Sequence, residues 1–182
     1  SRRQRQMCIR DRYSMVLVRE GLHLQAKTAA WGLPPTGPNN SFLINARMET
    51  VLEKPTFRDA FSLSRCIVVA SGWYEWSAPN TPWHIQLSDG GVMAMFGLLF
   101  DQGSRSRFLI LAGAADVKFV DIDHRRPLVL AAGTEMQWLA GTANQAAKYC
   151  EIAPAGWFNW YRVAPDVGKA VIDHPGLVTP LE

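Results

Sequence analysis

The pattern of hydrophobic and polar positions along the chain predicts many β-strands and few helices. Residues 15–18 form a short apolar run and residues 22–27 alternate, which together predict an N-terminal hairpin. Longer apolar or alternating runs predict further strands, at residues 65–70, 72–76, 82–87, 92–100, 107–112, 127–130 and 157–163. Residues 101–104 have the composition of a hairpin turn. The chain therefore contains enough strands for a complete sheet.

The predicted helices are few and short. We expect one near residues 49–52, entered through residues 43–47, one over residues 56–61 capped by Thr56, and one over residues 134–140 that begins at Thr134. Residues 116–120 are expected to be helical or a turn, and the Pro, Gly and Asn residues of 33–41 predict a loop. No internal repeat or Gly/Ser linker divides the chain. These features predict a single α+β domain built round a barrel-like antiparallel β-sheet with a few short helices.

The charge of the chain is unevenly distributed. Of 182 residues, 48% are hydrophobic and 19% charged, which is typical of one globular domain, and the formal net charge is +3. The first twelve residues hold five arginines and one acidic residue, whereas the remaining 170 hold 14 basic and 15 acidic residues. We therefore expect residues 1–13 to be a disordered or foreign basic tail and residues 14–182 to be the domain. Affinity for nucleic acid would depend on where the domain places its arginines.

Several classes of protein are excluded by simple counts. The chain has no run of 18 apolar residues, which excludes a transmembrane helix, and no apolar segment follows the N-terminal charges as in a secretory signal. The three cysteines and four histidines are scattered, so we expect no metal and no cofactor. An odd number of separated cysteines favours a reducing compartment, and we expect a cytoplasmic protein.

The most unusual local feature is Gly-Trp-Tyr-Glu-Trp at residues 72–76. Alternation along a strand puts Trp73 and Glu75 on one face and Tyr74 and Trp76 on the other. A carboxylate among aromatic side chains is expected to be partly buried. Burial raises the pKa of a carboxyl group towards neutral pH, as a general acid or base requires. The alternative is a glutamate at a sheet edge that pairs with an arginine.

Two other polar segments carry candidate chemistry. Asn45 offers a neutral donor and acceptor to a reacting oxygen, and Arg47 offers a fork of donors to a phosphate; helix capping and a surface salt bridge are the alternative. His124 lies between acidic residues and arginines, where Arg125 could hold a phosphate; an ordinary polar loop is the alternative. The other histidines lack such neighbours and are expected to be structural or exposed: His23, His84 and His174.

Cys8 directly follows Met7. If Met7 is the first residue made and is then removed, Cys8 has a free α-amine beside its thiol, and this pair condenses with an aldehyde to a thiazolidine. As an internal residue Cys8 would be inert, and Cys66 and Cys150 are expected to be buried structural thiols. Most tryptophans are expected to fill the core, with Trp31, just before the loop, the best candidate to stack on a base.

Together these segments resemble the SRAP family, the SOS-response-associated peptidases. The matching segments follow the family's order and spacing from about Val16 to the C-terminus: Asn-Ala-Arg-Met-Glu-Thr at 45–50, Lys-Pro-Thr-Phe-Arg at 54–58, Arg-Cys at 65–66, Gly-Trp-Tyr-Glu-Trp at 72–76 and Arg-Arg-Pro at 125–127. The resemblance implies an α+β domain round a barrel-like sheet, with a groove for single-stranded DNA and covalent shielding of abasic sites. It also implies a monomer without membrane contact, acting in the bacterial nucleoid during the SOS response to DNA damage.

The resemblance further implies a set of site residues. Cys8, freed from its methionine by self-cleavage or processing, would form a thiazolidine with the ring-opened sugar of an abasic site. Asn45 would orient the cysteine and the sugar, Glu75 would act as acid and base, and His124 would help to open the sugar ring. Two arginines would hold the flanking phosphates, Arg47 and Arg125.

The chain departs from the family pattern at three places. The family begins Met-Cys-Gly-Arg and reaches Arg-Tyr-Asn only after a longer segment, whereas here Met-Cys-Ile-Arg at 7–10 nearly abuts Arg-Tyr-Ser at 12–14. Either Cys8 is the nucleophile of a shortened protein or the tail is foreign. The family's Ile-His-Asp-Arg is Ile-Asp-His-Arg at 122–125, so His124 needs a local shift to reach the site. The family's C-terminal Val-Asn is replaced by Val-Gly-Lys at 167–169. Two alternatives stay open: a non-covalent single-stranded DNA binder without the nucleophile, and a thiol peptidase.

Overall fold

The computed structural model describes residues 13–35, 42–102, 105–169, 172 and 174–181. Cys8 and the rest of the basic segment, residues 1–12, lie outside the described residues. Tyr13, placed in the tail by the sequence pattern, begins the first strand.

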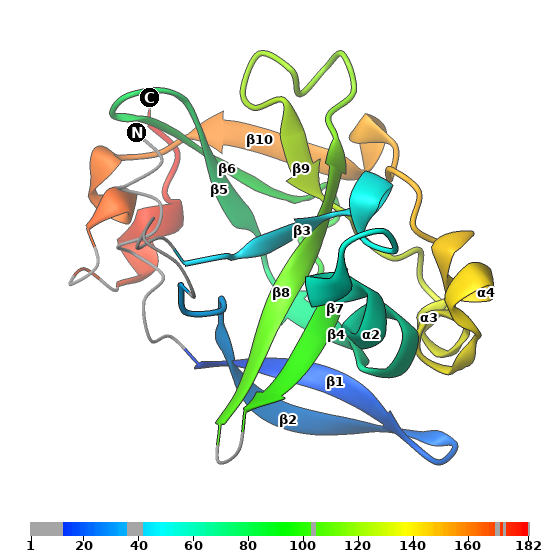
Figure 1. Ribbon diagram of the computed structural model, residues 1–182. Helices are drawn as coiled ribbons and strands as arrows, with labels where there is room; N and C mark the ends of the chain where they lie inside the picture. Colours follow the sequence, from blue (N-terminus) through cyan, green and yellow to red (C-terminus); the bar gives the residue numbers. More distant parts are fainter. Residues whose placement is uncertain (1–12, 36–41, 103–104, 170–171, 173, 182) are drawn as a thin grey trace.

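A seven-stranded sheet forms the main body of the protein (Figure 1). Its strand order is β2-β1-β4-β7-β8-β3, and β9 also pairs with β8. A further pairing of β2 with β8 closes the sheet, and the predicted α+β fold with a barrel-like, mostly antiparallel sheet is confirmed. The strands are β1 (Tyr13–Glu20), β2 (His23–Trp31), β3 (Asn45–Arg47), β4 (Arg65–Ala70), β7 (Met93–Gln102), β8 (Arg105–Ala114) and β9 (Arg125–Pro127).

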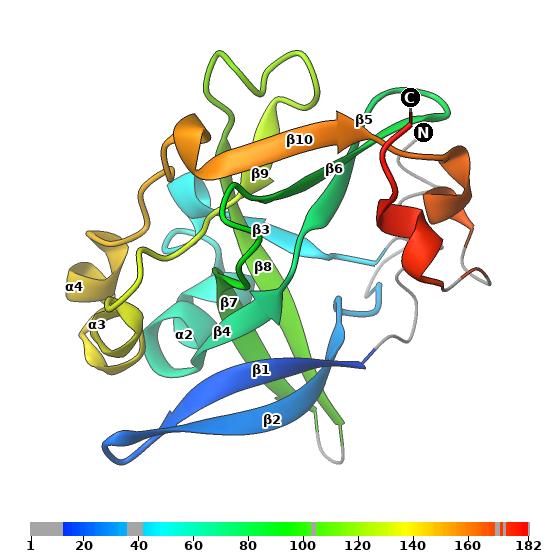
Figure 2. The same ribbon diagram turned by 180° about the vertical axis from the view of Figure 1, so that it is seen from behind.

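A second, three-stranded sheet lies across one end of the barrel, along the top in both Figure 1 and Figure 2. Its strand order is β10-β6-β5, so β5 is an edge strand. The strands are β5 (Trp73–Ala78), β6 (Thr81–Leu87) and β10 (Phe158–Arg162).

The helices are short, and the α-helices gather on one side of the large sheet, opposite the 3-10 helices of the C-terminal segment (Figure 1). The α-helices are α2 (Pro55–Leu63), α3 (Glu135–Ala140) and α4 (Ala143–Ala147). The 3-10 helices are η1 (Met48–Thr50), η2 (Ala155–Trp157), η3 (Pro165–Gly168) and η4 (Pro175–Val178). No helix among the described residues is long and apolar enough to cross a membrane.

Two hydrophobic cores follow from strand alternation. On β4, Ile67 joins a core shared with helices α2 and α3, whereas Cys66 and Val68 point the other way, into a core shared with the small sheet. The large sheet thus has a face covered by helices and a face covered by the second sheet. This second face contains the cavity described below.

Several predicted elements differ in detail. Residues 45–47, expected to lead into a helix, form strand β3, which pairs in parallel with β8, and only the 3-10 helix η1 follows. This pairing partner lies far along the chain, where a local pattern gives no information. Helix α2 begins at Pro55, one residue before Thr56, and has no side-chain cap. Helix α4 was not expected. Its N-terminus carries a capping box, in which the side chains and backbone N–H groups of Thr142 and Gln145 bond reciprocally, and this pattern is a sequence signature of a helix start.

Candidate functional site

A cavity of about 690 Å³ lies between the two sheets. The large sheet supplies an apolar floor, the edge strand β5 a wall, and the C-terminal segment a third side. The floor residues are Val68, Met95, Phe108 and Ile110, which are all buried. An apolar floor with a few polar groups on its walls is the usual composition of a small-molecule or reaction site.

Strand β5 directs Glu75 between the sheets. Trp73, on the same face of the strand, packs edge-on against Phe158 with 5.4 Å between ring centroids and lies 6.3 Å from Phe119. These contacts anchor Trp73 against the hydrophobic core beside the cavity, and Glu75, two residues further on, lines the cavity together with its neighbours Tyr74 and Trp76. Its side chain is half-buried, as the sequence pattern predicted.

Gly72 lets the chain pass close to strand β6 at the start of this wall. A Cβ atom at Gly72 would lie 2.3 Å from His84 Nε2 and 2.7 Å from the Ile85 carbonyl oxygen. His84 is buried, as expected for a structural histidine, and burial lowers its pKa. Its Nδ1 lies 3.1 Å from the hydroxyl of Tyr161, which donates to the Val178 carbonyl at 2.9 Å. The buried histidine thereby connects β5 to the C-terminal segment.

Gly72→Ala is expected to lower the free energy of unfolding by about 1–3 kcal/mol, because its methyl group meets a buried ring and a backbone carbonyl. Urea denaturation measures the change. Gly156→Ala is the matched control, because no heavy atom lies within 4 Å of the added methyl group, and its change should stay within about 0.5 kcal/mol. Equal stability of the two variants would contradict the close packing.

Strands β2 and β3 bring Trp31 and Asn45 to the same cavity. The Trp31 ring lies parallel to Phe108, at 4° and 6.4 Å between centroids, and its Nε1 donates to the Ile44 carbonyl at 2.8 Å. Asn45 follows directly and is exposed on its strand, whereas Ala46 is buried. Three of the predicted site residues therefore meet at one cavity, from three different parts of the sequence: Trp31, Asn45 and Glu75.

Arg47 and Arg125 lie outside the cavity lining. Arg47 is exposed and, by alternation, shares a face of β3 with Asn45. Arg125 Nη2 donates to Glu49 Oε2 at 2.6 Å and to the Ala112 carbonyl at 2.9 Å. Burial alone would raise the pKa of Glu49, but the hydrogen bond and charge of Arg125, with backbone N–H groups, hold this pKa below its ordinary value.

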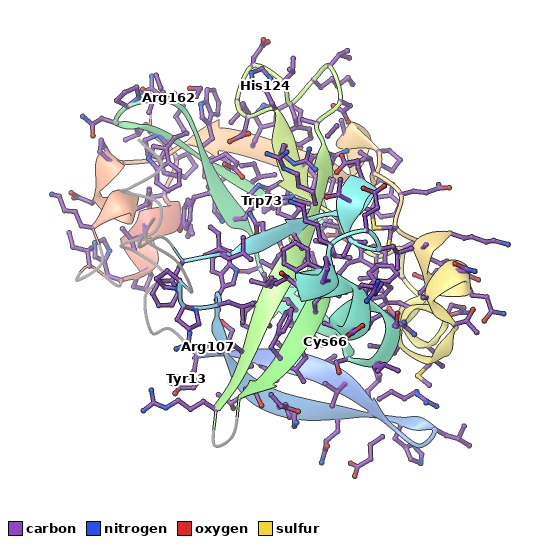
Figure 3. All side chains as sticks on the ribbon, in the orientation of Figure 1. Tyr13, Cys66, Trp73, Arg107, His124 and Arg162 are labelled. Carbon is purple, nitrogen blue, oxygen red and sulfur yellow. The ribbon has the colours of Figure 1, made fainter. Side chains whose placement is uncertain are left out.

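His124 is exposed and also lies outside the cavity lining. In Figure 3 it projects from the loop above β9, separated from Trp73 in the middle of the molecule. The carboxylate of the preceding Asp123 accepts the Arg125 backbone N–H at 3.0 Å. The role assigned to His124 by resemblance stays a prediction.

The structure adds two polar residues to the cavity that sequence reasoning did not place there, Lys169 and His174. Both come from the C-terminal segment, and no local pattern marks them because tertiary packing alone brings that segment to β5. The Lys169 ammonium lies 2.5 Å from the Asp166 carboxylate. Among the described residues, no group of three or more His, Cys, Asp or Glu side chains is arranged to hold a metal ion.

The two described cysteines lie away from this chemistry. Burial raises the pKa of the fully buried Cys66 thiol, and it raises that of Cys150, which is partly buried, to about 12. Both thiols stay protonated at neutral pH and are therefore poor nucleophiles, as expected for structural cysteines.

Comparison with known proteins identifies the family of this chain. Abasic site processing protein YedK of Escherichia coli is 33% identical over 172 residues, which cover 87% of this chain and 77% of that protein. Abasic site processing protein YoaM of Bacillus subtilis is 30% identical over 138 residues, 69% of this chain and 61% of that protein. A crystal structure from Bacteroides thetaiotaomicron shares the fold, with a TM-score of 0.79 over 94% of this chain and 82% of that one, at 22% identity. The family model for SOS response associated peptidase (SRAP) matches residues 2–170, and the chain belongs to this family.

Proposed function

We propose that this protein processes abasic sites in single-stranded DNA by forming a covalent thiazolidine link through Cys8. The observation that carries the proposal is the convergence of Glu75, Asn45 and Trp31 on one cavity with an apolar floor. The names of the relatives, all abasic site processing proteins, point to the same class of substrate. Such a protein would act as a monomer at the bacterial nucleoid in the SOS response to DNA damage.

The proposed reaction joins the Cys8 amine and thiol to the aldehyde carbon of the ring-opened sugar. The amine attacks the carbonyl carbon, the C=O π electrons move to oxygen, and a proton passes from nitrogen to that oxygen. Loss of water gives an imine, and the thiol sulfur then adds to the same carbon while its proton goes to nitrogen, closing the ring. Glu75 accepts and returns the protons of these steps, and Asn45 orients the cysteine and the sugar.

The DNA chain would pass over the mouth of the cavity. Arg47, exposed on the same face of β3 as Asn45, is placed to meet a phosphate, and Trp31 offers a ring for base stacking. Arg125 already donates to Glu49 and Ala112 through Nη2, so it would contact phosphate through its remaining N–H groups. Removal of Met7 as the initiator residue, which exposes the Cys8 amine, would be the self-directed peptidase step of this proposal.

The test is incubation of the protein with single-stranded DNA in which uracil has been excised. Protein that starts at Cys8 is expected to give an adduct that survives heat and detergent, seen as a slower band on a denaturing gel. Cys8→Ser should give no such band, because an alcohol does not form the stable sulfur ring, and intact uracil DNA is the control for the lesion. Salt-dependent binding without any adduct would instead favour a non-covalent DNA binder.

A further inference from the structure

We propose that His174, and not His124, is the histidine that contacts the reacting sugar, as a neutral hydrogen-bond donor to its carbonyl oxygen. The inference deepens the proposed function and rests on it. Among the described residues that line the cavity, His174 is the one imidazole, and it shares the cavity with Glu75 and Asn45.

The C-terminal segment holds His174 in a defined position. The Tyr161 hydroxyl donates to the Val178 carbonyl at 2.9 Å, and the Leu181 N–H donates to the Arg162 carbonyl at 2.9 Å. Both bonds fasten the segment to strand β10. The Leu177 N–H donates to the carbonyl of His174 itself at 3.1 Å and closes the short helix η4 behind it. Figure 1 shows this helix on the side of the molecule where β3 begins.

Hydrogen bonding fixes which ring nitrogen of His174 carries the proton. Nδ1 accepts the Gly176 backbone N–H at 3.1 Å, so it bears no proton of its own. The neutral ring must then carry its proton on Nε2, which has no hydrogen-bond partner among the described residues. A neutral ring in this tautomer donates one hydrogen bond through Nε2 and cannot accept one there.

This tautomer determines what His174 can do in the reaction. When the amine attacks the aldehyde, the π electron pair moves onto the carbonyl oxygen, and a donor stabilises the charge that develops there. The proton that finally neutralises the oxygen comes from the attacking nitrogen, with Glu75 carrying it, so His174 gains and loses none. The apolar floor of the cavity lowers the dielectric on one side of the oxygen, which strengthens such a hydrogen bond.

His124 differs from His174 in its place relative to the cavity. Both side chains are exposed, but His124 lies outside the cavity lining, and the adjacent Asp123 fixes its local backbone by accepting the Arg125 N–H. His124, in the loop where His and Asp are transposed, therefore does not line the cavity. The histidine that does line it comes from the C-terminal segment.

The test uses the protein with Cys8 as its first residue, which retains every described residue, and measures the rate of adduct formation with abasic single-stranded DNA. His174→Ala is expected to slow the reaction about tenfold or more, whereas His174→Gln, which keeps an N–H donor, slows it less. DNA affinity should change by less than about twofold, because the donor acts on developing charge. His23→Ala, at an exposed position on β2, is the matched control and should react at the unmodified rate.

The outcomes separate this inference from the proposed function. If His174→Ala retains its thermal unfolding transition and reacts within about twofold of the unmodified protein, the inference is wrong while the proposed function stands. The same follows if His124→Ala is slower than His174→Ala. If the unmodified protein forms no adduct at all, the proposed function fails and the inference fails with it.

Discussion

Replacing Arg65 with methionine is expected to lower the free energy of unfolding by about 3–5 kcal/mol, the largest effect on stability that we predict for a single substitution. Arg65 is buried, and burial lowers the pKa of its guanidinium from the ordinary value. Methionine has a similar length and fills most of the space, so the loss reflects the guanidinium rather than a cavity.

The reason is that Arg65 connects the ends of two helices. Its N–H groups donate to the carbonyls of Phe61 and Ser62 at the end of α2, at 2.6 and 3.2 Å. They also donate to the carbonyls of Trp138, at 2.6 Å, and of Gly141 at the end of α3. The last carbonyls of a helix have no hydrogen-bond donor within the helix. Each buried carbonyl that is left without a donor lowers the free energy of unfolding by about 1–3 kcal/mol.

Chemical denaturation in urea measures the effect, and Arg58→Met is the matched control. Arg58 lies on the exposed side of α2, and its contact with Asp59, 3.7 Å long, is open to solvent. Exposed ion pairs contribute little, so the control should differ from the unmodified protein by less than about 0.5 kcal/mol. Similar stability of the two variants would show that other groups satisfy the helix ends.

Glu75→Gln is expected to slow formation of the DNA adduct by about 100-fold or more, the largest effect on activity that we predict. Glutamine keeps the shape of the side chain and its ability to hydrogen-bond, but it cannot accept and return a proton. Since Glu75 is the one carboxylate among the described residues of the cavity lining, no other side chain there can replace it.

The measurement is the single-turnover rate of adduct formation across a range of pH. The unmodified protein should lose rate at low pH as the Cys8 amine and the Glu75 carboxylate become protonated, and Glu75→Gln should lose most of its rate and keep only the dependence that comes from the amine. Glu53→Gln removes the same charge from an exposed position outside the cavity and should leave the rate unchanged within about twofold. A Glu75→Gln protein with the unmodified rate and pH profile would overturn the acid–base role.

The local sequence determined the strands and the direction of the key side chains on them. Alternation along residues 72–76 predicted that Trp73 and Glu75 share a face, and in the structure both residues line the cavity, as do Tyr74 and Trp76. Such a prediction is possible because the period of a strand is a property of the backbone and needs no information about distant segments. The same holds for the single α+β domain, which the spacing of strands and turns predicted.

Only the tertiary structure decided which polar groups meet. Strand β3 is three residues long and exists because Asn45 to Arg47 pair with Ile110 to Ala112, about 65 residues further along the chain. Likewise, His174 reaches the cavity because Tyr161 and Arg162 hold the C-terminal segment on β10, and Arg65 caps two helices that are separated in sequence. The sequence by itself determined the strands and the candidate residue types, whereas long-range hydrogen bonds and side-chain packing, which have no local signature, decided which of them form the site.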